Sequence, residues 1–192
     1  MFFNMEKCCM ENNVLKTILE RRTIRFYKDE QITDEQLAAI LEAAVWAPSG
    51  RNGQPCHIRV LQDKKALDAL NVDFKNKVGW DTPAYTNYNI SPVYQNAPTL
   101  IFLFAEGNSA MDGGIMTENI CIAAKSMGLG TCIIASVGGL MNEPEGDIWK
   151  ERLHIPADWK FLIAIAVGIP DEDPAPKPRA EGRVEIFKEL DI

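Results

Sequence analysis

The strongest candidate for binding chemistry is a run from Arg21 to Arg25 that holds three guanidinium groups and one hydroxyl. Arginine offers forked donors that match phosphate oxygens. In an extended segment Arg21, Thr23 and Arg25 would point to the same side of the backbone. The same run could instead be a solvated group of charges that caps a helix. Taken alone, the run leaves both interpretations open.

Two further segments could act on the same kind of ligand. Residues 47–55, APSGRNGQP, are dense in turn formers and amides, and such a loop exposes backbone donors and acceptors that suit the edge of a flat heterocycle. It could equally be an ordinary connection between a helix and a strand. Later, Lys177-Pro178-Arg179 places two cations on a proline-stiffened stretch, which could close over an anion or be a solvated tail.

Hydrophobic periodicity predicts the elements that must position these segments. We expect helices at about 13–21, 33–47, 64–78, 110–127 and 147–153, and strands at 57–61, 99–104, 131–135 and 161–167. Thr33 and Gln36 can form a capping box for the second helix, and Pro48 ends it. The runs 99–104 and 161–167 are continuously apolar, as expected for central strands covered on both faces.

Three other stretches have no single predicted structure or lie at interfaces. Residues 110–127 are apolar nearly all round, which is typical of a helix buried on several sides, often in a dimer core. Residues 79–95 lack periodicity but hold four aromatic side chains, so they form either a lid or a loop pinned by aromatics. Four prolines between 170 and 178 predict an extended arm, and 183–187 could add an edge strand to it.

Length and composition indicate a single α+β domain over residues 1–192, with residues 1–12 flexible and 170–192 forming the C-terminal arm. No apolar run approaches the roughly 20 residues that span a bilayer, and no leader pattern is evident, so we expect a cytoplasmic protein without membrane contact. The net charge of -7 argues against nucleic acid as a partner. Five unpaired cysteines and two isolated histidines predict neither disulfides nor a metal site.

The ordered set of motifs resembles the nitroreductase-like FMN-dependent oxidoreductase family. The motifs are RRTIR, then APSGRNGQP, then GLGT after a buried helix, then a late KPR, and they run from about Leu15 to Arg179. The resemblance implies a central mixed sheet flanked by helices, and a homodimer that exchanges the C-terminal arm and holds FMN at the subunit interface. It also implies no metal. A dinucleotide fingerprint at Gly128-Leu129-Gly130 is excluded because it follows a helix and precedes a strand.

The resemblance also assigns cofactor-binding residues. These would be Arg21, Arg22, Thr23, Arg25, Lys177 and Arg179 from one subunit, Pro48, Ser49, Gly50, Arg51, Asn52 and Gln54 from the other, and Ser136, Val137, Gly138 and Gly139 over the ring. Arg25 would stabilise the negative charge of the reduced flavin. Relatives usually have an acidic residue in place of Gly138 and an aromatic in place of Cys56. No carboxylate can therefore act at position 138, and the pocket at Cys56 could be reshaped.

The implied function is ping-pong electron transfer from NAD(P)H through FMN to a small electrophilic acceptor, which could be a nitroaromatic, a quinone, a flavin or an enone. Alternatives are a non-catalytic FMN carrier or sensor and an anion-binding protein without flavin. The sequence does not choose the physiological acceptor or between NADH and NADPH.

Overall fold

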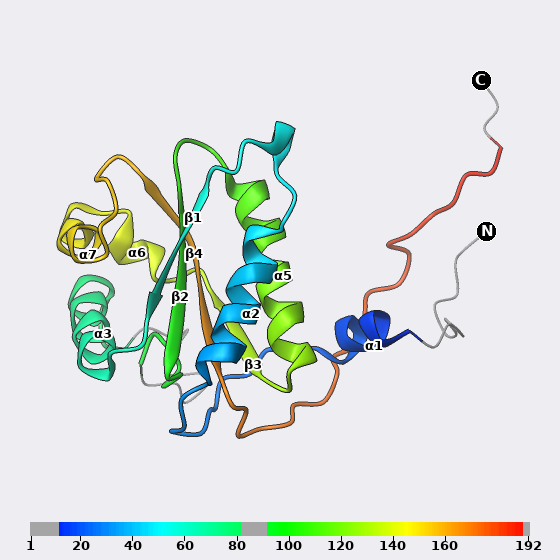
Figure 1. Ribbon diagram of the computed structural model, residues 1–192, viewed down its shortest axis with the longest axis horizontal. Coiled ribbons are helices and arrows are strands. Elements are labelled where there is room, and N and C mark those ends of the chain that lie inside the picture. Colours follow the sequence, from blue (N-terminus) through cyan, green and yellow to red (C-terminus); the bar gives the residue numbers. More distant parts are fainter. Residues whose placement is uncertain (1–11, 82–91, 190–192) are drawn as a thin grey trace.

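The computed structural model describes residues 12–81 and 92–189, and its centre is a four-stranded sheet (Figure 1). The strands lie in the order β1-β2-β4-β3. Their bounds are β1 Cys56–Leu61, β2 Thr99–Ala105, β3 Gly130–Ile134 and β4 Lys160–Gly168. The two continuously apolar strands, β2 and β4, are therefore central, as predicted.

The sheet is antiparallel rather than mixed. Each of its three neighbouring strand pairs runs antiparallel. In the described part of the chain, parallel pairing is confined to the isolated bridge between Thr23 and Thr131. The expectation of a mixed sheet, which came from the family resemblance, is wrong for these four strands; the continuous apolar runs indicated cover on both faces and gave no strand direction.

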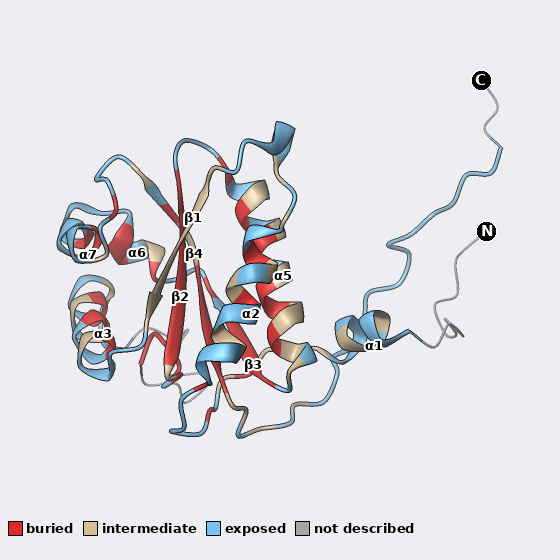
Figure 2. Ribbon diagram, in the orientation of Figure 1, coloured by how far each residue is buried: buried red, intermediate tan, exposed pale blue. Residues whose placement is uncertain are grey.

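Helices cover both faces of the sheet (Figure 2). On one face lie α2, Asp34–Val45, and α5, Ala110–Ser126; on the other lie α3, Lys64–Val78, α6, Gly138–Met141, and α7, Asp147–Arg152. Two clusters of buried apolar side chains result, one on each side. Every residue of β2 is buried between them, which explains its unbroken hydrophobicity.

The ends of α2 and α5 follow local sequence signals. Thr33 caps α2, and Gln36 completes the predicted capping box. The helix ends at Val45, before Pro48. Gly128, at φ +78°, takes the left-handed conformation expected after α5. Short 3₁₀ turns, η1 Gly50–Asn52 and η2 Pro144–Gly146, complete the elements.

Two segments lie outside the packed body. Helix α1, Asn13–Glu20, has no buried residue, and the side chain of Asn12 caps its N-terminus. Of residues 1–12, which the sequence predicted to be flexible, Asn12 is therefore part of a helix cap, and residues 1–11 lie outside the described residues. The arm from residue 170 has no helix or named strand up to 189, and it extends away from the sheet (Figure 1). The edge strand considered for 183–187 is not among the four strands of this chain.

Candidate functional site

The arginine segment leaves α1 and runs beside the start of β3. The amide of Ile24 donates to the carbonyl of Thr131 over 2.9 Å, and Thr23 forms a bridge with the same residue. Ile24 is buried, whereas Thr23 and Arg25 are half-buried. This is the extended alternation that the sequence predicts, with the side chain of Ile24 in the core and its neighbours directed away from it.

Gly130 permits this close approach. A Cβ added at Gly130 would lie 2.8 to 2.9 Å from three side-chain atoms of Ile24, which is closer than real contacts allow. The glycine in the GLGT motif therefore lets the arginine segment pack directly on the strand.

The first two arginines have partners within the chain. Arg22 Nη1 donates to the carbonyls of Leu19 and Arg21, each over 2.7 Å, and so caps the last turn of α1. Arg21 Nε lies 4.0 Å from Glu118 on α5. Arg22 thus takes the helix-capping part that the alternative interpretation assigned to the whole run, while Thr23 and Arg25 lie beyond the helix end.

Arg25 acts electrostatically on buried groups behind the segment. Burial raises the pKa of the Cys132 thiol to about 11, and the nearby Arg25 cation opposes that shift. Burial likewise raises the pKa of Tyr27 well above its usual value, with Cys132 and Glu172 adding to the shift and Arg25 opposing it. Tyr27 Oη donates to the carbonyl of Ile24 over 2.6 Å, so a neutral phenol supports the backbone of the arginine segment from the core side.

The loop between α2 and β1 has a strained backbone. Arg51, Asn52 and Gln54 all have positive φ, at +53°, +55° and +46°. Side chains with a Cβ rarely adopt this conformation, and clusters of such residues are typical of binding sites. The composition of the loop predicted turns but gave no sign of this strain.

A carboxylate on α5 holds the loop in place. Asp112 Oδ1 accepts from the amide of Gly50 over 2.9 Å, and Ser49 Oγ accepts from the amide of Gln54 over 3.0 Å. Our sequence analysis missed Asp112, because a single acidic residue in the first turn of a helix is ordinarily explained by the helix dipole.

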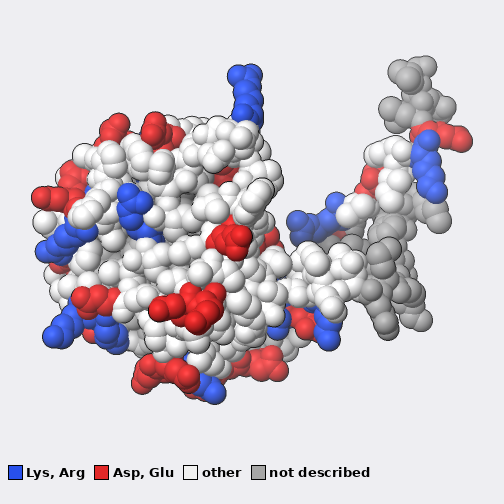
Figure 3. Space-filling model, viewed as in Figure 1, with Lys and Arg blue, Asp and Glu red and all other residues white. Residues whose placement is uncertain are grey.

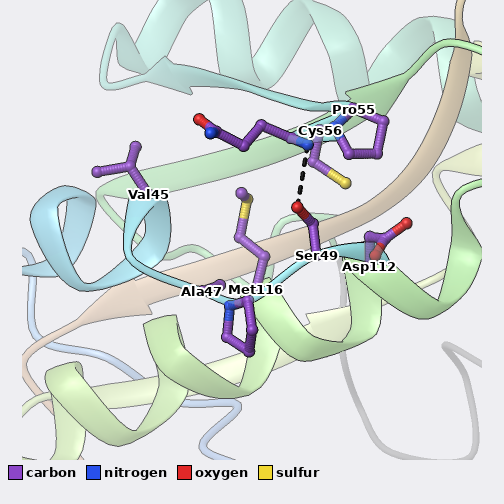
Figure 4. A pocket seen from close by; sticks show the side chains of 9 residues that line it. Val45, Ala47, Ser49, Pro55, Cys56, Asp112 and Met116 are labelled. Atoms are coloured by element: carbon purple, nitrogen blue, oxygen red, sulfur yellow. Dashed lines mark hydrogen bonds between the residues drawn. The ribbon is translucent and has the colours of Figure 1, made fainter. Parts of the chain in front are cut away.

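A cavity of about 100 Å³ lies beneath this loop (Figure 4). Its lining comes from the end of α2, the loop, the start of β1 and α5, and includes Ser49, Cys56, Asp112 and Met116. Burial raises the pKa of the Cys56 thiol, and Asp112 adds to the shift, so the thiol stays protonated near neutral pH. Cys56 is therefore a small, weakly polar wall of the cavity and a poor nucleophile.

The arginine segment and the loop attach to different parts of α5. The loop is bonded to Asp112 in the first turn of α5, whereas the backbone of Thr23 and Ile24 lies against Thr131, beyond the C-terminus of this helix. Arg21 reaches back to Glu118, which lies roughly 9 Å from Asp112 along the helix axis at 1.5 Å per residue. The two predicted halves of the site are therefore held at separate places within one chain.

The glycine pair after β3 exposes backbone at the surface. Val137 is buried, whereas Ser136 and Gly139 are exposed. The amides of Gly138 and Gly139 donate to the carbonyls of Ala135 and Ser136 in the turn that starts α6. Because both amides already donate within the turn, a ligand over this segment would have to share these donors with the two carbonyls. The buried side chain of Val137 holds the turn against the core.

The remaining predicted site residues lie on the arm or next to undescribed chain. Lys177 and Arg179 are exposed, so their contact with a phosphate stays a prediction. Of residues 79–95, the part from 82 to 91 lies outside the described residues, and Val93 and Tyr94 are fully buried anchors. Glu172, which our sequence analysis also missed, bonds the root of the arm to the arginine segment.

Three features of the described residues bear on nucleic-acid, metal and membrane binding. Acidic and basic side chains are interspersed over the face seen in Figure 3, without a broad basic field. Within residues 12–81 and 92–189, no group of three or more acidic, histidine or cysteine side chains could hold a metal ion. No helix of that part is both long and apolar enough to cross a membrane.

Comparison with known proteins identifies the family. The model of the Nitroreductase family matches residues 18–169. The chain belongs to the nitroreductase family. That range includes the arginine segment, the strained loop and the glycine pair, and it confirms the resemblance that the motifs indicated.

Individual relatives agree with this membership. The NADPH-flavin oxidoreductase of Vibrio harveyi is 31% identical over 194 residues, covering 94% of this chain and 77% of that protein. An FMN-bound nitroreductase of Desulfitobacterium hafniense superposes with a TM-score of 0.84 at 25% identity, over 93% of this chain and all of the other. An FMN-bound nitroreductase of Bacteroides fragilis has a TM-score of 0.81 at 30% identity, over 92% and 100%.

Proposed function

We propose that this nitroreductase-family protein is an FMN-dependent oxidoreductase that takes electrons from NAD(P)H and passes them to a small electrophilic acceptor. The supporting relatives are a flavin oxidoreductase and two nitroreductases solved with FMN. Bound FMN supplies the redox chemistry, since it can accept hydride from a nicotinamide and release electrons to a second substrate. The residues of the chain bind the cofactor and set its surroundings.

The separation of the arginine segment from the strained loop carries the dimeric part of the proposal. Both regions have the chemistry to hold a flavin, yet within one chain they attach to different parts of α5. A second copy whose loop faces the first copy's arginine segment would complete the site. The exposed Val45, Trp46 and Met111 near the loop support this, because monomeric proteins rarely leave such apolar groups together at the surface.

The residues present fit a flavin phosphate and ring. Thr23 and Arg25 point away from the core at the end of α1, where guanidinium and hydroxyl donors suit phosphate and ribityl oxygens. Across the proposed interface, the loop of Pro48, Ser49, Gly50, Arg51, Asn52 and Gln54 offers exposed backbone groups to the ring edge. The turn of Ser136 to Gly139 is exposed at its two end residues and lacks a carboxylate at Gly138.

Arg25 has a defined electrostatic part in this proposal. Its positive charge already reaches the buried Cys132 and Tyr27, whose pKa values it lowers against the effect of burial. The same charge would stabilise an anionic ring edge and so favour reduction of the cofactor. We further propose a ping-pong cycle, in which the nicotinamide and the acceptor occupy one pocket in turn. Nitroaromatics, quinones, flavins and enones are the candidate acceptors.

The visible spectrum of the purified protein, followed by anaerobic NADH and NADPH titration, tests this function. We expect flavin absorption bands that bleach with one of the nicotinamides and return when a quinone or nitroaromatic is added. A yellow protein that neither nicotinamide bleaches would instead be a flavin carrier or sensor. A colourless protein that takes up no added FMN would contradict the proposal altogether.

A further inference from the structure

The root of the C-terminal arm is paired with the arginine segment in a regular antiparallel register. Lys28 donates its amide to the carbonyl of Ile169 over 3.0 Å, and Asp171 donates to Phe26 over 2.9 Å. Between them Tyr27 forms an antiparallel bridge with Pro170. The chain that leaves the sheet after β4 therefore lies alongside the chain that follows the arginine segment.

Glu172 continues this pairing with its side chain. Its Oε1 accepts hydrogen bonds from two consecutive backbone amides, those of Arg25 and, over 3.3 Å, Phe26. Carboxylates bind backbone amides more strongly than neutral acceptors do. Because Arg25 lies opposite Glu172 in the register, the carboxylate extends the pairing of the two segments by one residue pair.

The register gives an expected path for the arm beyond Glu172. If it were continued by four residues in each segment, Pro176 would be level with Arg21 and Lys177 would lie beside it. Proline cannot donate a ladder hydrogen bond, so beyond Glu172 the prolines of the arm cannot maintain the pairing with backbone bonds alone. The position of the arm cations should thus depend on the attachment at Glu172.

We propose that Glu172 is a positioning residue, which fixes the root of the arm on the backbone of Arg25 and Phe26 so that Lys177 and Arg179 reach the phosphate held by Arg21 and Thr23. This inference rests on the proposed function for its phosphate, but the attachment itself does not require FMN. Glu172 touches neither cofactor nor substrate and acts through the cations that follow it in the chain.

The attachment is tested first in the FMN-free protein, by hydrogen exchange of individual backbone amides. Glu172→Ala should speed exchange at Arg25 and Phe26 by about tenfold or more, since each loses a charge-assisted hydrogen bond. Glu172→Gln keeps an acceptor oxygen and should retain most of the protection. The amides of Ile24 and Lys28, bonded to Thr131 and Ile169, report whether the whole segment has opened.

A matched control removes a neighbouring charge. Asp173 is exposed and adjacent, so Asp173→Asn changes the net charge equally while leaving both amides bonded to Glu172. We expect wild-type exchange in this variant. Unchanged exchange at Arg25 and Phe26 in Glu172→Ala would overturn the attachment, as would equal acceleration in Asp173→Asn.

The positioning part is tested by a double-mutant cycle on FMN affinity. Glu172→Ala alone should weaken FMN binding by about tenfold, as expected when a charge-assisted phosphate contact is displaced. If Glu172 acts by placing Arg179, this loss should largely disappear in an Arg179→Ala background, because the arm then has less to place. Additive losses would show a general structural effect and overturn the positioning role.

Failure of this inference is distinguishable from failure of the proposed function. Wild-type protein that takes up no FMN contradicts the function, and the positioning role falls with it, whereas the exchange experiment still decides the attachment. Wild-type protein that binds FMN, combined with unchanged exchange or additive losses, contradicts only the role of Glu172.

Discussion

The arginine segment and the α2–β1 loop carry similar binding chemistry on very different supports. The arginine segment is bonded to β3 on one side and to the root of the arm on the other, with Ile24 and Tyr27 buried beneath it. The loop is held to α5 by Asp112 but has three side-chain-bearing residues at positive φ over a cavity. The backbone of the arginine segment is hydrogen-bonded on both sides, whereas the loop has a strained backbone and lies over a cavity.

This difference indicates which of the two regions a second copy of the chain would complete. A strained backbone persists only where its surroundings stabilise it, and such segments are typical of binding sites. The backbone of the arginine segment is supported within one chain, so we expect this segment to contribute phosphate contacts without rearranging. We expect the loop to gain further contacts when a second copy and the cofactor cover it. The predictions below test this contrast.

The largest effect should follow from removing phosphate-binding charge from the arginine segment and the arm. Arg21→Ala and Arg179→Ala should each weaken FMN binding by about 1.5 to 3 kcal/mol, the cost of a lost charge-assisted contact. Fluorescence titration of the FMN-free protein measures this. Arg183→Ala, further along the exposed arm, is the control and should bind like wild type. Undiminished affinity in both test variants would remove the arginine segment and the arm from the site.

The next effect should be an alkaline loss of stability centred on Cys132. Its pKa of about 11 in the folded protein lies above the ordinary 9.0, so below pH 9 both states hold the proton and the stabilisation is fully present. Between about pH 9 and 11 only the unfolded chain releases it, and stability should fall by about 2 to 3 kcal/mol. Denaturant midpoints across this range measure the slope.

Variants of two cysteines compare the two regions in the same experiment. Cys132→Ala should flatten the alkaline slope, because the buried thiol behind the arginine segment is then gone. Cys56→Ala should change the slope less, since Cys56 is only half-buried. Burial also raises the pKa values of Cys121 and Tyr27, so part of the slope should remain in Cys132→Ala. A slope that Cys132→Ala leaves unchanged, or that depends mainly on Cys56, would count against this placement of Cys132.

A third effect should come from blocking the approach of the arginine segment to β3. Gly130→Ala should destabilise the FMN-free protein by about 1 to 3 kcal/mol, since the new Cβ would overlap Ile24 and force the segment outward. Gly50→Ala is the control in the loop, where the nearest atom is Asp112 Oδ1 at 4.0 Å. Thermal unfolding compares them, and equal costs would mean that the segment is not closely packed.

The smallest effect should be relief of strain in the loop. Arg51→Gly should raise the stability of the FMN-free protein by about 0.5 to 1 kcal/mol, because glycine adopts positive φ without steric cost. Ser49→Gly, at φ -136°, should instead lower stability, since it loses the hydroxyl bond to Gln54. Chemical denaturation measures both, and a destabilised Arg51→Gly variant would show that the loop holds no releasable strain.

Local signals predicted much of this fold. The capping box at Thr33, the left-handed Gly128 and the apolar runs of β2 and β4 each reflect interactions between near neighbours or simple burial. The mixed sheet implied by the resemblance was wrong for these four strands, and the apolar runs could not correct it because they carry no directional information. The order of elements along the chain was therefore easier to predict than their pairing.

The candidate site was predicted by residue type but not by geometry. Motifs located the arginine segment, the loop and the arm cations. They did not reveal Asp112 or Glu172, since each bonds backbone amides far away in the sequence, 62 residues for Asp112 and up to 147 for Glu172. Contacts of this kind depend on tertiary packing and leave no local pattern. The local cap that Arg22 forms on α1 was among the alternatives, but the motif did not show which arginine forms it.

The central claim is that two copies of the chain share each flavin. Native mass spectrometry across a dilution series tests it most directly, because this method measures the number of chains and of bound FMN molecules in each complex. If the arginine segment of one copy and the strained loop of another share each flavin, FMN should travel only with dimers, one per chain, and monomers formed on dilution should be flavin-free. Monomers that keep FMN would contradict the account.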